Sequence, residues 1–140
     1  IDCSVSIADN LPDLICNEQQ LQQVVLNMIS NARYALNTKY PQSGAEKKLE
    51  IKGELYTETG TAWVRLTFID NGVGIQPEIR DRLFDPFFST KPKGEGTGLG
   101  LSISHGLIKD HGGNIKMQST VGEWTRFTIE LPVKSEQGAE

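Results

Sequence analysis

The sequence has little of what membrane, disulfide-rich or nucleic-acid-binding proteins depend on. Its 140 residues include only two cysteines, Cys3 and Cys16, too few for a disulfide framework and without a metal-binding spacing. The longest apolar runs are a few residues long, against the roughly 20 that a membrane span requires. Lys and Arg number 14 against 18 Asp and Glu, so the net charge of −4 argues against a nucleic acid as the main partner.

These features predict a globular protein in a reducing, cytoplasmic setting with buried thiols. A chain of this length has room for one core, so we expect one domain over residues 1–134 and a polar tail over residues 135–140. The start Ile1-Asp2-Cys3 lacks a methionine and a basic leader, which suggests a piece of a longer protein.

Hydrophobic spacing predicts three helices and five strands. Leu21, Val24, Met28, Ala32 and Leu36 recur at intervals of three and four, which indicates an amphipathic helix of about 20 residues from Asn17 onwards. Further helices are predicted over residues 77–84 and 99–111, and strands over residues 4–7, 49–56, 63–70, 114–120 and 124–131. This order favours an α+β two-layer sandwich, a mixed and mostly antiparallel sheet with helices on one face.

A glycine-rich loop leads into the helix predicted over residues 99–111. It reads Gly94-Glu95-Gly96-Thr97-Gly98-Leu99-Gly100-Leu101. Glycines let backbone approach a ligand closely, and free amides at a helix start favour an anion, so phosphate binding is one interpretation. A plain flexible linker is the other, because the Walker spacing is absent.

A carboxylate continues an apolar row at the end of the second predicted hairpin strand. Val64, Leu66, Phe68 and Asp70 share one face, and Asp70 is followed by Asn71-Gly72-Val73-Gly74-Ile75. An Asp at the rim of an apolar pocket can accept a hydrogen bond from an exocyclic amine such as that of adenine. Alternatively, the segment is a tight turn with Asp70 as a local acceptor.

Polar side chains elsewhere allow similar pairs of interpretations. Asn27 and Asn31 share one helix face, either as oxygen ligands for Mg²⁺ or as solvated amides. Lys91, in a predicted mobile loop, either neutralises phosphate or faces solvent. Phe84, with Phe87 and Phe88, either anchors a lid or a partner or belongs to a satellite core. For His105 and His111 we expect structural roles, because neither has an acidic neighbour placed as a catalytic partner.

Taken in order, these motifs resemble the four nucleotide-binding boxes of sensor histidine kinases. The matching segments are Asn27 to Ala32, Asp70 to Gly74, Phe84-Asp85-Pro86-Phe87-Phe88 and Gly96-Thr97-Gly98-Leu99-Gly100-Leu101. The resemblance covers residues 16–131. It implies the ATP-binding catalytic domain of a two-component kinase, in the superfamily that includes gyrase, a mismatch-repair ATPase and a large heat-shock chaperone.

The resemblance assigns roles to individual residues. It makes Asp70 the acceptor for the adenine amino group, with Gly74 allowing the base to approach, and it gives Mg²⁺ to Asn31 with help from Asn27. Residues 87–97 would form the ATP lid, and Thr125 would reach adenine through water. The implied ATP-binding residues are Asn31, Asp70, Gly72, Gly74, Ile75, Phe84, Lys91, Gly96, Thr97, Gly98, Leu99, Gly100, Leu101 and Thr125.

Two departures from the family pattern affect the predicted chemistry. Hydrolysing members carry a glutamate where this chain has Asn27, and an amide cannot act as a general base, so transfer to a histidine is expected over hydrolysis. Many sensor kinases carry a phosphate-binding lysine where this chain has Tyr34, which leaves open whether Arg33 replaces it.

Neither histidine of the chain resembles the family's phosphoacceptor. The resemblance therefore implies two partners, a separate dimerisation and phosphoacceptor helical hairpin and a response-regulator receiver domain. It also implies a homodimeric full-length kinase, while the isolated domain is expected to be monomeric. Membrane anchoring of the full-length protein stays open. The alternatives are a degenerate nucleotide- or partner-binding module and a serine kinase or ATPase of the same superfamily.

Overall fold

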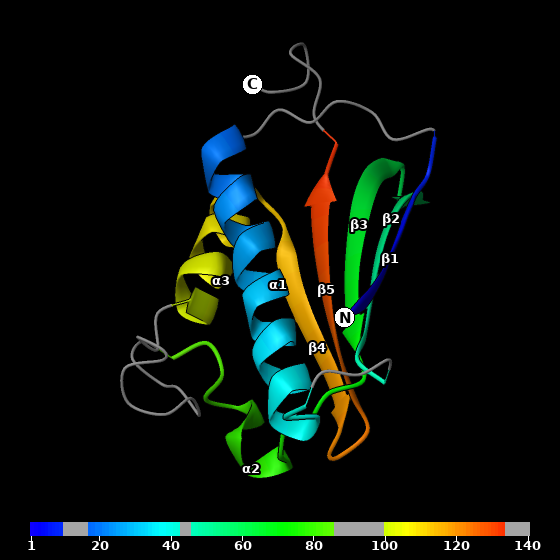
Figure 1. Ribbon diagram of the computed structural model, residues 1–140. Helices are drawn as coiled ribbons and strands as arrows, with labels where there is room; N and C mark the ends of the chain where they lie inside the picture. The colour runs from blue at the N-terminus through cyan, green and yellow to red at the C-terminus, as the bar shows by residue number, and fades with distance from the viewer. Residues whose placement is uncertain (10–16, 43–45, 86–99, 134–140) are drawn as a thin grey trace.

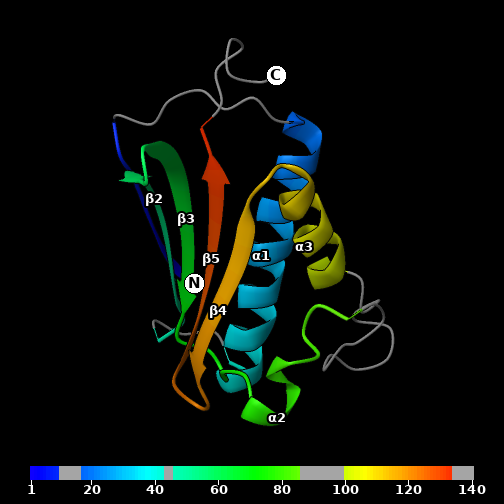
Figure 2. The ribbon, with the colours of Figure 1, turned by 180° about the vertical axis from the view of Figure 1, so that it is seen from behind.

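The computed structural model describes residues 1–9, 17–42, 46–85 and 100–133. Helices lie on one side of a five-stranded sheet, in two layers (Figures 1 and 2). The strands are β1 (Asp2–Ile7), β2 (Lys48–Glu58), β3 (Thr61–Asp70), β4 (Asn114–Thr120) and β5 (Trp124–Pro132), and the helices are α1 (Glu18–Lys39), α2 (Pro77–Arg80) and α3 (Gly100–Asp110). Within these ranges no helix is long and apolar enough to span a membrane.

The sheet is mixed, with the strand order β1-β2-β3-β5-β4. Only the pair β1 and β2 is parallel; the other neighbours are antiparallel. The hairpin between β2 and β3 turns at Thr59 and Gly60, both with positive φ, as a tight turn that matches the strand twist requires. The predicted α+β sandwich, with its mixed and mostly antiparallel sheet, is confirmed.

The core lies between the sheet and the two long helices. The stripe predicted on α1 supplies its buried residues Val24, Met28, Ala32 and Leu36. On β5, every second residue from Thr125 to Leu131 faces these helix residues. All four of these strand residues are buried, as the alternation predicted. Asn17 caps α1 by accepting the backbone amide of Gln20 at 3.0 Å.

Two expectations were wrong in detail. The second helix ends at Arg80 rather than at residue 84, because the amides of Arg82, Leu83 and Asp85 donate to carbonyls three residues earlier and so form successive tight turns. Cys3 is exposed rather than buried, since it lies on the edge strand β1, all of whose residues are exposed. Cys16 lies outside the described residues.

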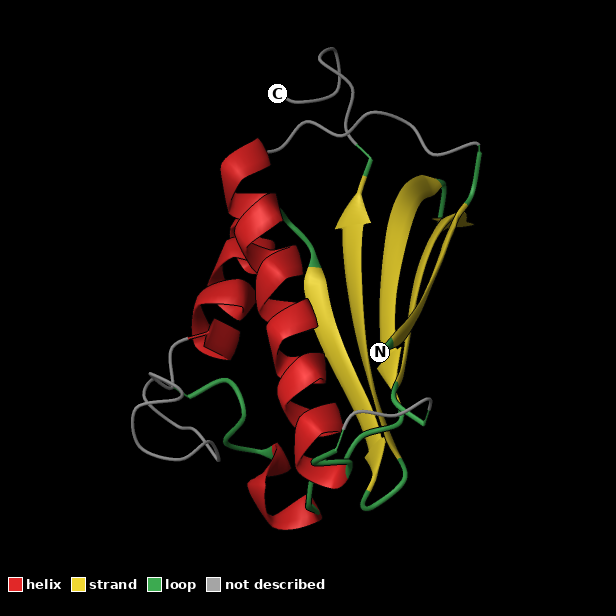
Figure 3. Cartoon of the chain, in the orientation of Figure 1, coloured by secondary structure: helices red, strands yellow, loops and turns green. Residues whose placement is uncertain are grey.

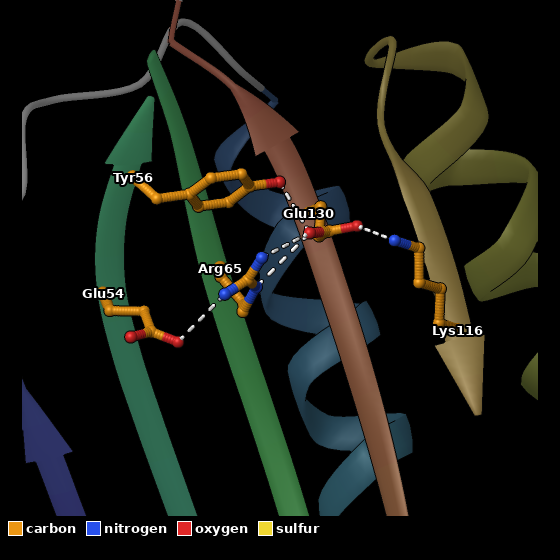
Figure 4. A network of polar contacts seen from close by, with 5 residues as sticks. All are labelled: Glu54, Tyr56, Arg65, Lys116 and Glu130. Atoms are coloured by element: carbon orange, nitrogen blue, oxygen red, sulfur yellow. Dashed lines mark hydrogen bonds and ion pairs between the residues drawn. The ribbon is translucent and has the colours of Figure 1, made fainter. Parts of the chain in front are cut away.

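The helices pack against one face of the sheet (Figure 3), and the opposite face carries a polar cluster (Figure 4). Glu130, buried on β5, accepts hydrogen bonds from Tyr56 at 2.5 Å and from Arg65 at 3.2 Å, and pairs with Lys116 at 2.8 Å. Burial opposes ionisation of Glu130, but the bonds from Lys116, Tyr56 and Arg65 outweigh it and lower the pKa of this carboxyl. Burial and the bond to Glu130 raise the pKa of Tyr56 to about 12.

Candidate functional site

A pocket of about 110 Å³ opens between the C-terminal half of α1, the segment that follows β3, and β5. It lies at the end of the sheet where α2 and the β4–β5 turn are found (Figure 1). Six of the predicted nucleotide-binding residues line it: Asn31, Asp70, Gly74, Ile75, Leu101 and Thr125. The sequence thus identified side chains from four elements that fold into one site.

Asp70 supplies the buried charge of the pocket. Asp70 is 4% exposed, and its Oδ1 accepts a hydrogen bond from the backbone amide of Gly72 at 2.9 Å. The carboxylate lines the pocket. Burial raises the pKa of Asp70 to about 6, against the opposing influence of the Gly72 amide and the charge of Lys39. The group is therefore mainly ionised at neutral pH and acts as an acceptor.

The turn after Asp70 is fixed from both sides. Asn71 accepts the backbone amide of Lys48 at 2.8 Å and donates to the carbonyl of Glu46 at 2.7 Å. Val73 donates its amide to the carbonyl of Ala35 on α1, at 3.2 Å, and accepts that of Gly122 at 2.7 Å. The tight turn with Asp70 as a local acceptor is confirmed, and this turn presents the buried carboxylate to the pocket.

Glycines at 72 and 74 are required by neighbouring backbone. A Cβ at Gly72 would lie 2.7 Å from the carbonyl carbon of Ala35, so this residue lets the turn approach α1. Gly74 has φ +77°, and a Cβ there would lie 2.6 Å from the carbonyl oxygen of Thr120. Gly72 does not line the pocket. The structure therefore explains the glycine at position 74 by its close contact with the β4–β5 turn, an explanation that the sequence did not supply.

The two asparagines of α1 have different surroundings. Asn31 lines the pocket, and its buried amide nitrogen has no hydrogen-bond partner among the described residues. Asn27 donates from its amide nitrogen to the carbonyl of Gly100 at 3.2 Å and to Ser104 Oγ at 3.0 Å. These bonds fix the orientation of the Asn27 amide.

The donor set suits Mg²⁺ shared with phosphate. Turning the Asn31 amide by 180° exchanges nitrogen and oxygen without a change of shape, so Asn31 can offer an oxygen to a cation or a donor to phosphate. Across the described ranges, no three His, Cys, Asp or Glu side chains gather as a metal cluster. Mg²⁺ commonly keeps several waters and is shared with substrate phosphates, so two amides fit such an ion.

Thr125, which the resemblance assigned to adenine, lines the pocket and contacts a second hydroxyl that the sequence reasoning missed, that of Ser119. Thr125 is 4% exposed and lies directly opposite Asp70 in the β3–β5 register. Its hydroxyl is 3.1 Å from Ser119 Oγ on β4. Ser119 is a polar residue in the inward-facing row that Ile115 and Met117 begin on β4. A polar residue that continues an apolar row also singled out Asp70, so the same pattern could have identified Ser119.

The remaining candidates lie around the pocket or outside the described residues. Tyr34 lines the pocket, whereas Arg33 is exposed. Phe84 packs against the core and its ring stacks on His105 with a centroid distance of 4.9 Å. Gly100 begins α3. Five predicted phosphate-loop residues lie outside the described residues: Lys91, Gly96, Thr97, Gly98 and Leu99.

His111 has a structural role. Its Nε2 accepts the backbone amide of Asn17 at 3.0 Å, and its Nδ1 is 2.8 Å from the carbonyl of Leu107. A ring that accepts at Nε2 carries its proton on Nδ1, which then donates to Leu107. The ring thereby connects the end of α3 to the start of α1.

Comparison with known proteins finds a family model and curated relatives over most of this chain. Residues 16–135 match the family described as histidine kinase-, DNA gyrase B-, and HSP90-like ATPase. The two-component sensor PprA of Pseudomonas aeruginosa is 42% identical over 115 residues, which are 81% of this chain and 12% of PprA. The sensor histidine kinase ZraS of Escherichia coli K12 is 36% identical over 125 residues, 89% of this chain and 24% of ZraS. The chain therefore spans a small part of these relatives.

Solved structures show the same fold. The catalytic domain of the histidine kinase ThkA superposes with a TM-score of 0.73 at 30% identity, covering 94% of this chain and 78% of that one. Full-length ShkA, in complex with AMPPNP, gives 0.76 at 24% identity over 96% of this chain and 26% of that one. These matches confirm the resemblance to sensor histidine kinases that the motifs indicated.

Proposed function

Because the chain belongs to the family of histidine kinase-, DNA gyrase B-, and HSP90-like ATPases, we propose that it binds ATP with Mg²⁺ and transfers the γ-phosphoryl group to a histidine of a separate phosphoacceptor hairpin. The observation that carries the proposal is the carboxylate of Asp70, buried at the pocket wall with Oδ1 held by the Gly72 amide. Such an acceptor suits the amino group of adenine.

The other residues of the pocket suit the rest of the nucleotide. Leu101, Ile75 and Phe127 provide apolar walls for the base. Asn31 and Asn27 would hold Mg²⁺ at the phosphates, where the ion neutralises phosphate charge when bound. The predicted loop of Gly96, Gly98 and Gly100 would donate backbone amides to the phosphate chain, with Lys91 as an added positive charge.

The transfer step needs a nucleophile from outside this chain. The neutral imidazole of the acceptor histidine attacks the γ-phosphorus through its unprotonated nitrogen, and ADP leaves with the electron pair of the broken phosphorus–oxygen bond. The proton on the other ring nitrogen passes to solvent. Asn27 cannot act as a base for water, so the site favours the supplied histidine over hydrolysis. This domain contributes position and charge stabilisation.

The proposal places the chain in two-component signalling. Its partners are the phosphoacceptor hairpin, within a homodimeric kinase of which this chain is a cytoplasmic domain, and a receiver domain that accepts the phosphoryl group from the histidine. The names of the matched relatives, a two-component sensor and a sensor histidine kinase, support this assignment.

Calorimetric titration with ATP, with and without Mg²⁺, tests the binding half. We expect binding that Mg²⁺ strengthens and that Asp70→Asn abolishes, with Asp110→Asn, an exposed carboxylate of α3, as the matched control. Absence of binding in the wild-type chain would favour a degenerate module.

Phosphotransfer is tested by supplying a phosphoacceptor hairpin in trans with labelled ATP. Acid-labile label on the hairpin supports the proposal. Acid-stable label indicates a serine kinase, and release of free phosphate without labelled hairpin indicates an ATPase.

A further inference from the structure

We propose that Ser119 is a positioning residue that makes Thr125 a pure hydrogen-bond acceptor, and so selects a 6-aminopurine over a 6-oxopurine. The inference rests on the proposed nucleotide function of the pocket. It concerns the direction of the hydrogen bonds behind the pocket wall.

Within the described part of the chain, Ser119 Oγ makes three polar contacts. It accepts the backbone amide of Ile75 at 2.8 Å, donates to the carbonyl oxygen of Trp124 at 2.7 Å, and lies 3.1 Å from Thr125 Oγ1. Ser119 is buried, and so is Thr125. The serine therefore connects the turn after Asp70 to the β4–β5 turn through one oxygen atom.

Counting protons fixes the direction of the third contact. A serine hydroxyl has one proton and two lone pairs. The Ile75 amide can only donate and the Trp124 carbonyl can only accept, so Ser119 uses its proton on the carbonyl and one lone pair on the amide. What remains is its second lone pair, and Thr125 must therefore donate to Ser119.

The direction of this bond determines what Thr125 shows to a ligand. With its proton turned towards Ser119, the hydroxyl of Thr125 offers only lone pairs to the pocket that it lines. Thr125 lies directly opposite Asp70 in the strand register, and the carboxylate of Asp70 is also an acceptor. The two residues thus present adjacent acceptors at one end of the pocket.

Adjacent acceptors match an amino group and reject an oxo group. The 6-amino group of adenine has two N–H donors, one for Asp70 and one for Thr125, directly or through a water. The 6-oxygen of hypoxanthine would face acceptors on both sides and leave them unpaired, which binding sites discriminate against strongly. If Ser119 is removed, the proton of Thr125 is free to turn into the pocket and to donate to that oxygen.

The test compares dissociation constants for ATP and inosine triphosphate in the wild-type chain and in Ser119→Ala. We expect the ratio of the inosine constant to the ATP constant to fall by about tenfold in the variant, the effect of reversing one hydrogen bond. Ser119→Cys, with a thiol of similar size and weaker hydrogen bonds, should shift the ratio in the same direction and serves if the alanine variant does not fold.

Two further variants separate positioning from loss of structure. Ile115→Val weakens the core beneath the same strand and should leave the ratio unchanged. In a Thr125→Val background, Ser119→Ala should cause no further change of the ratio, because the inferred effect of Ser119 on the ratio passes through the Thr125 hydroxyl.

The possible outcomes distinguish this inference from the proposed function. A wild-type chain that binds neither nucleotide would overturn the proposed function and this inference with it. A wild-type chain that prefers ATP, while Ser119→Ala keeps the wild-type ratio, would overturn this inference alone. A shift that persists in the Thr125→Val background would also overturn it.

Discussion

Asn27 donates from its side-chain amide to the hydroxyl of Ser104 at 3.0 Å, and this bond joins the two long helices behind the pocket. Ser104 is fully buried on α3, and the same amide also reaches the carbonyl of Gly100 at the start of that helix. Asn27 is thus a helix-to-helix connector in this chain.

Asn27→Ala should lower the free energy of unfolding by about 1–2 kcal/mol, because it leaves the buried Ser104 hydroxyl without its donor. Urea denaturation measures the change. Gln23→Ala, an exposed change on the same helix, is the control and should have no effect. Equal stability of the two variants would show that the Asn27 bond contributes nothing.

Asp70→Asn should stabilise the ligand-free chain while abolishing ATP binding. In the folded chain the pKa of Asp70 is about 6, above the ordinary value of 3.8. The stability that this group contributes is therefore fully present at a pH below 3.8 and is lost as the pH rises through 6. An amide avoids that loss, and we expect a gain of about 2–3 kcal/mol above pH 7 that shrinks as pH falls.

Denaturation of wild type, Asp70→Asn and Asp110→Asn across this pH range measures the effect. A gain that persists unchanged at about pH 5, below the folded pKa, would contradict the assigned cause.

Gly74→Ala and Gly122→Ala form a matched pair, with φ of +77° and +78°. Both variants incur the strain of a positive φ, about 1 kcal/mol. Only at Gly74 does the new Cβ meet backbone, 2.6 Å from Thr120 oxygen, whereas nothing lies within 4 Å at Gly122. Thermal denaturation and ATP titration should therefore show a larger loss of stability for Gly74→Ala, with weakened ATP binding. Similar losses in both variants would mean that the contact with Thr120 is unimportant.

Glu130→Gln should destabilise the chain by about 2–3 kcal/mol, because Arg65 and Lys116 lose their buried partner. The pKa of Glu130 is lowered on folding, so its contribution is present at neutral pH and lost as pH falls through that lowered value. The variant should lack this acid-dependent loss. ATP affinity should not change, since the cluster lies on the sheet face away from the helices.

Glu50→Gln is the control for this cluster, because the pair of Glu50 and Lys52 is exposed and 3.6 Å apart. Denaturation at neutral and acidic pH compares the two variants. Equal losses would indicate that burial of Glu130 adds nothing.

The sequence predicted the elements well and the contacts between them poorly. Periodicity located α1 and its buried stripe because the same residues that form the helix also form the core. The row ending in Asp70 revealed the pocket carboxylate, since a charge on the inward face of a strand costs free energy unless a partner or a ligand meets it. These features are local and repeat along the chain.

What the sequence could not reveal depends on distant neighbours. Nothing near Ser119 shows that its hydroxyl meets both the turn after Asp70 and Thr125. Glu130 alternates with inward residues, which predicts exposure, yet Arg65, Tyr56 and Lys116 cover it. The contact of Gly72 with Ala35 arises only when the turn after β3 meets the end of α1.

The tight turn at Thr59 and Gly60 has a kinetic consequence. It lets β2 and β3 pair with almost no chain to close, so this hairpin can form early in folding. The bond of Ile75 to Ser119 spans 44 positions, and that of Arg65 to Glu130 spans 65. Both bonds form only when β4 or β5, which follow α3 in the sequence, meet residues that precede α3. Closing these long loops costs conformational entropy. We therefore expect the pocket, whose lining residue Ile75 is bonded to Ser119, to assemble after the hairpin.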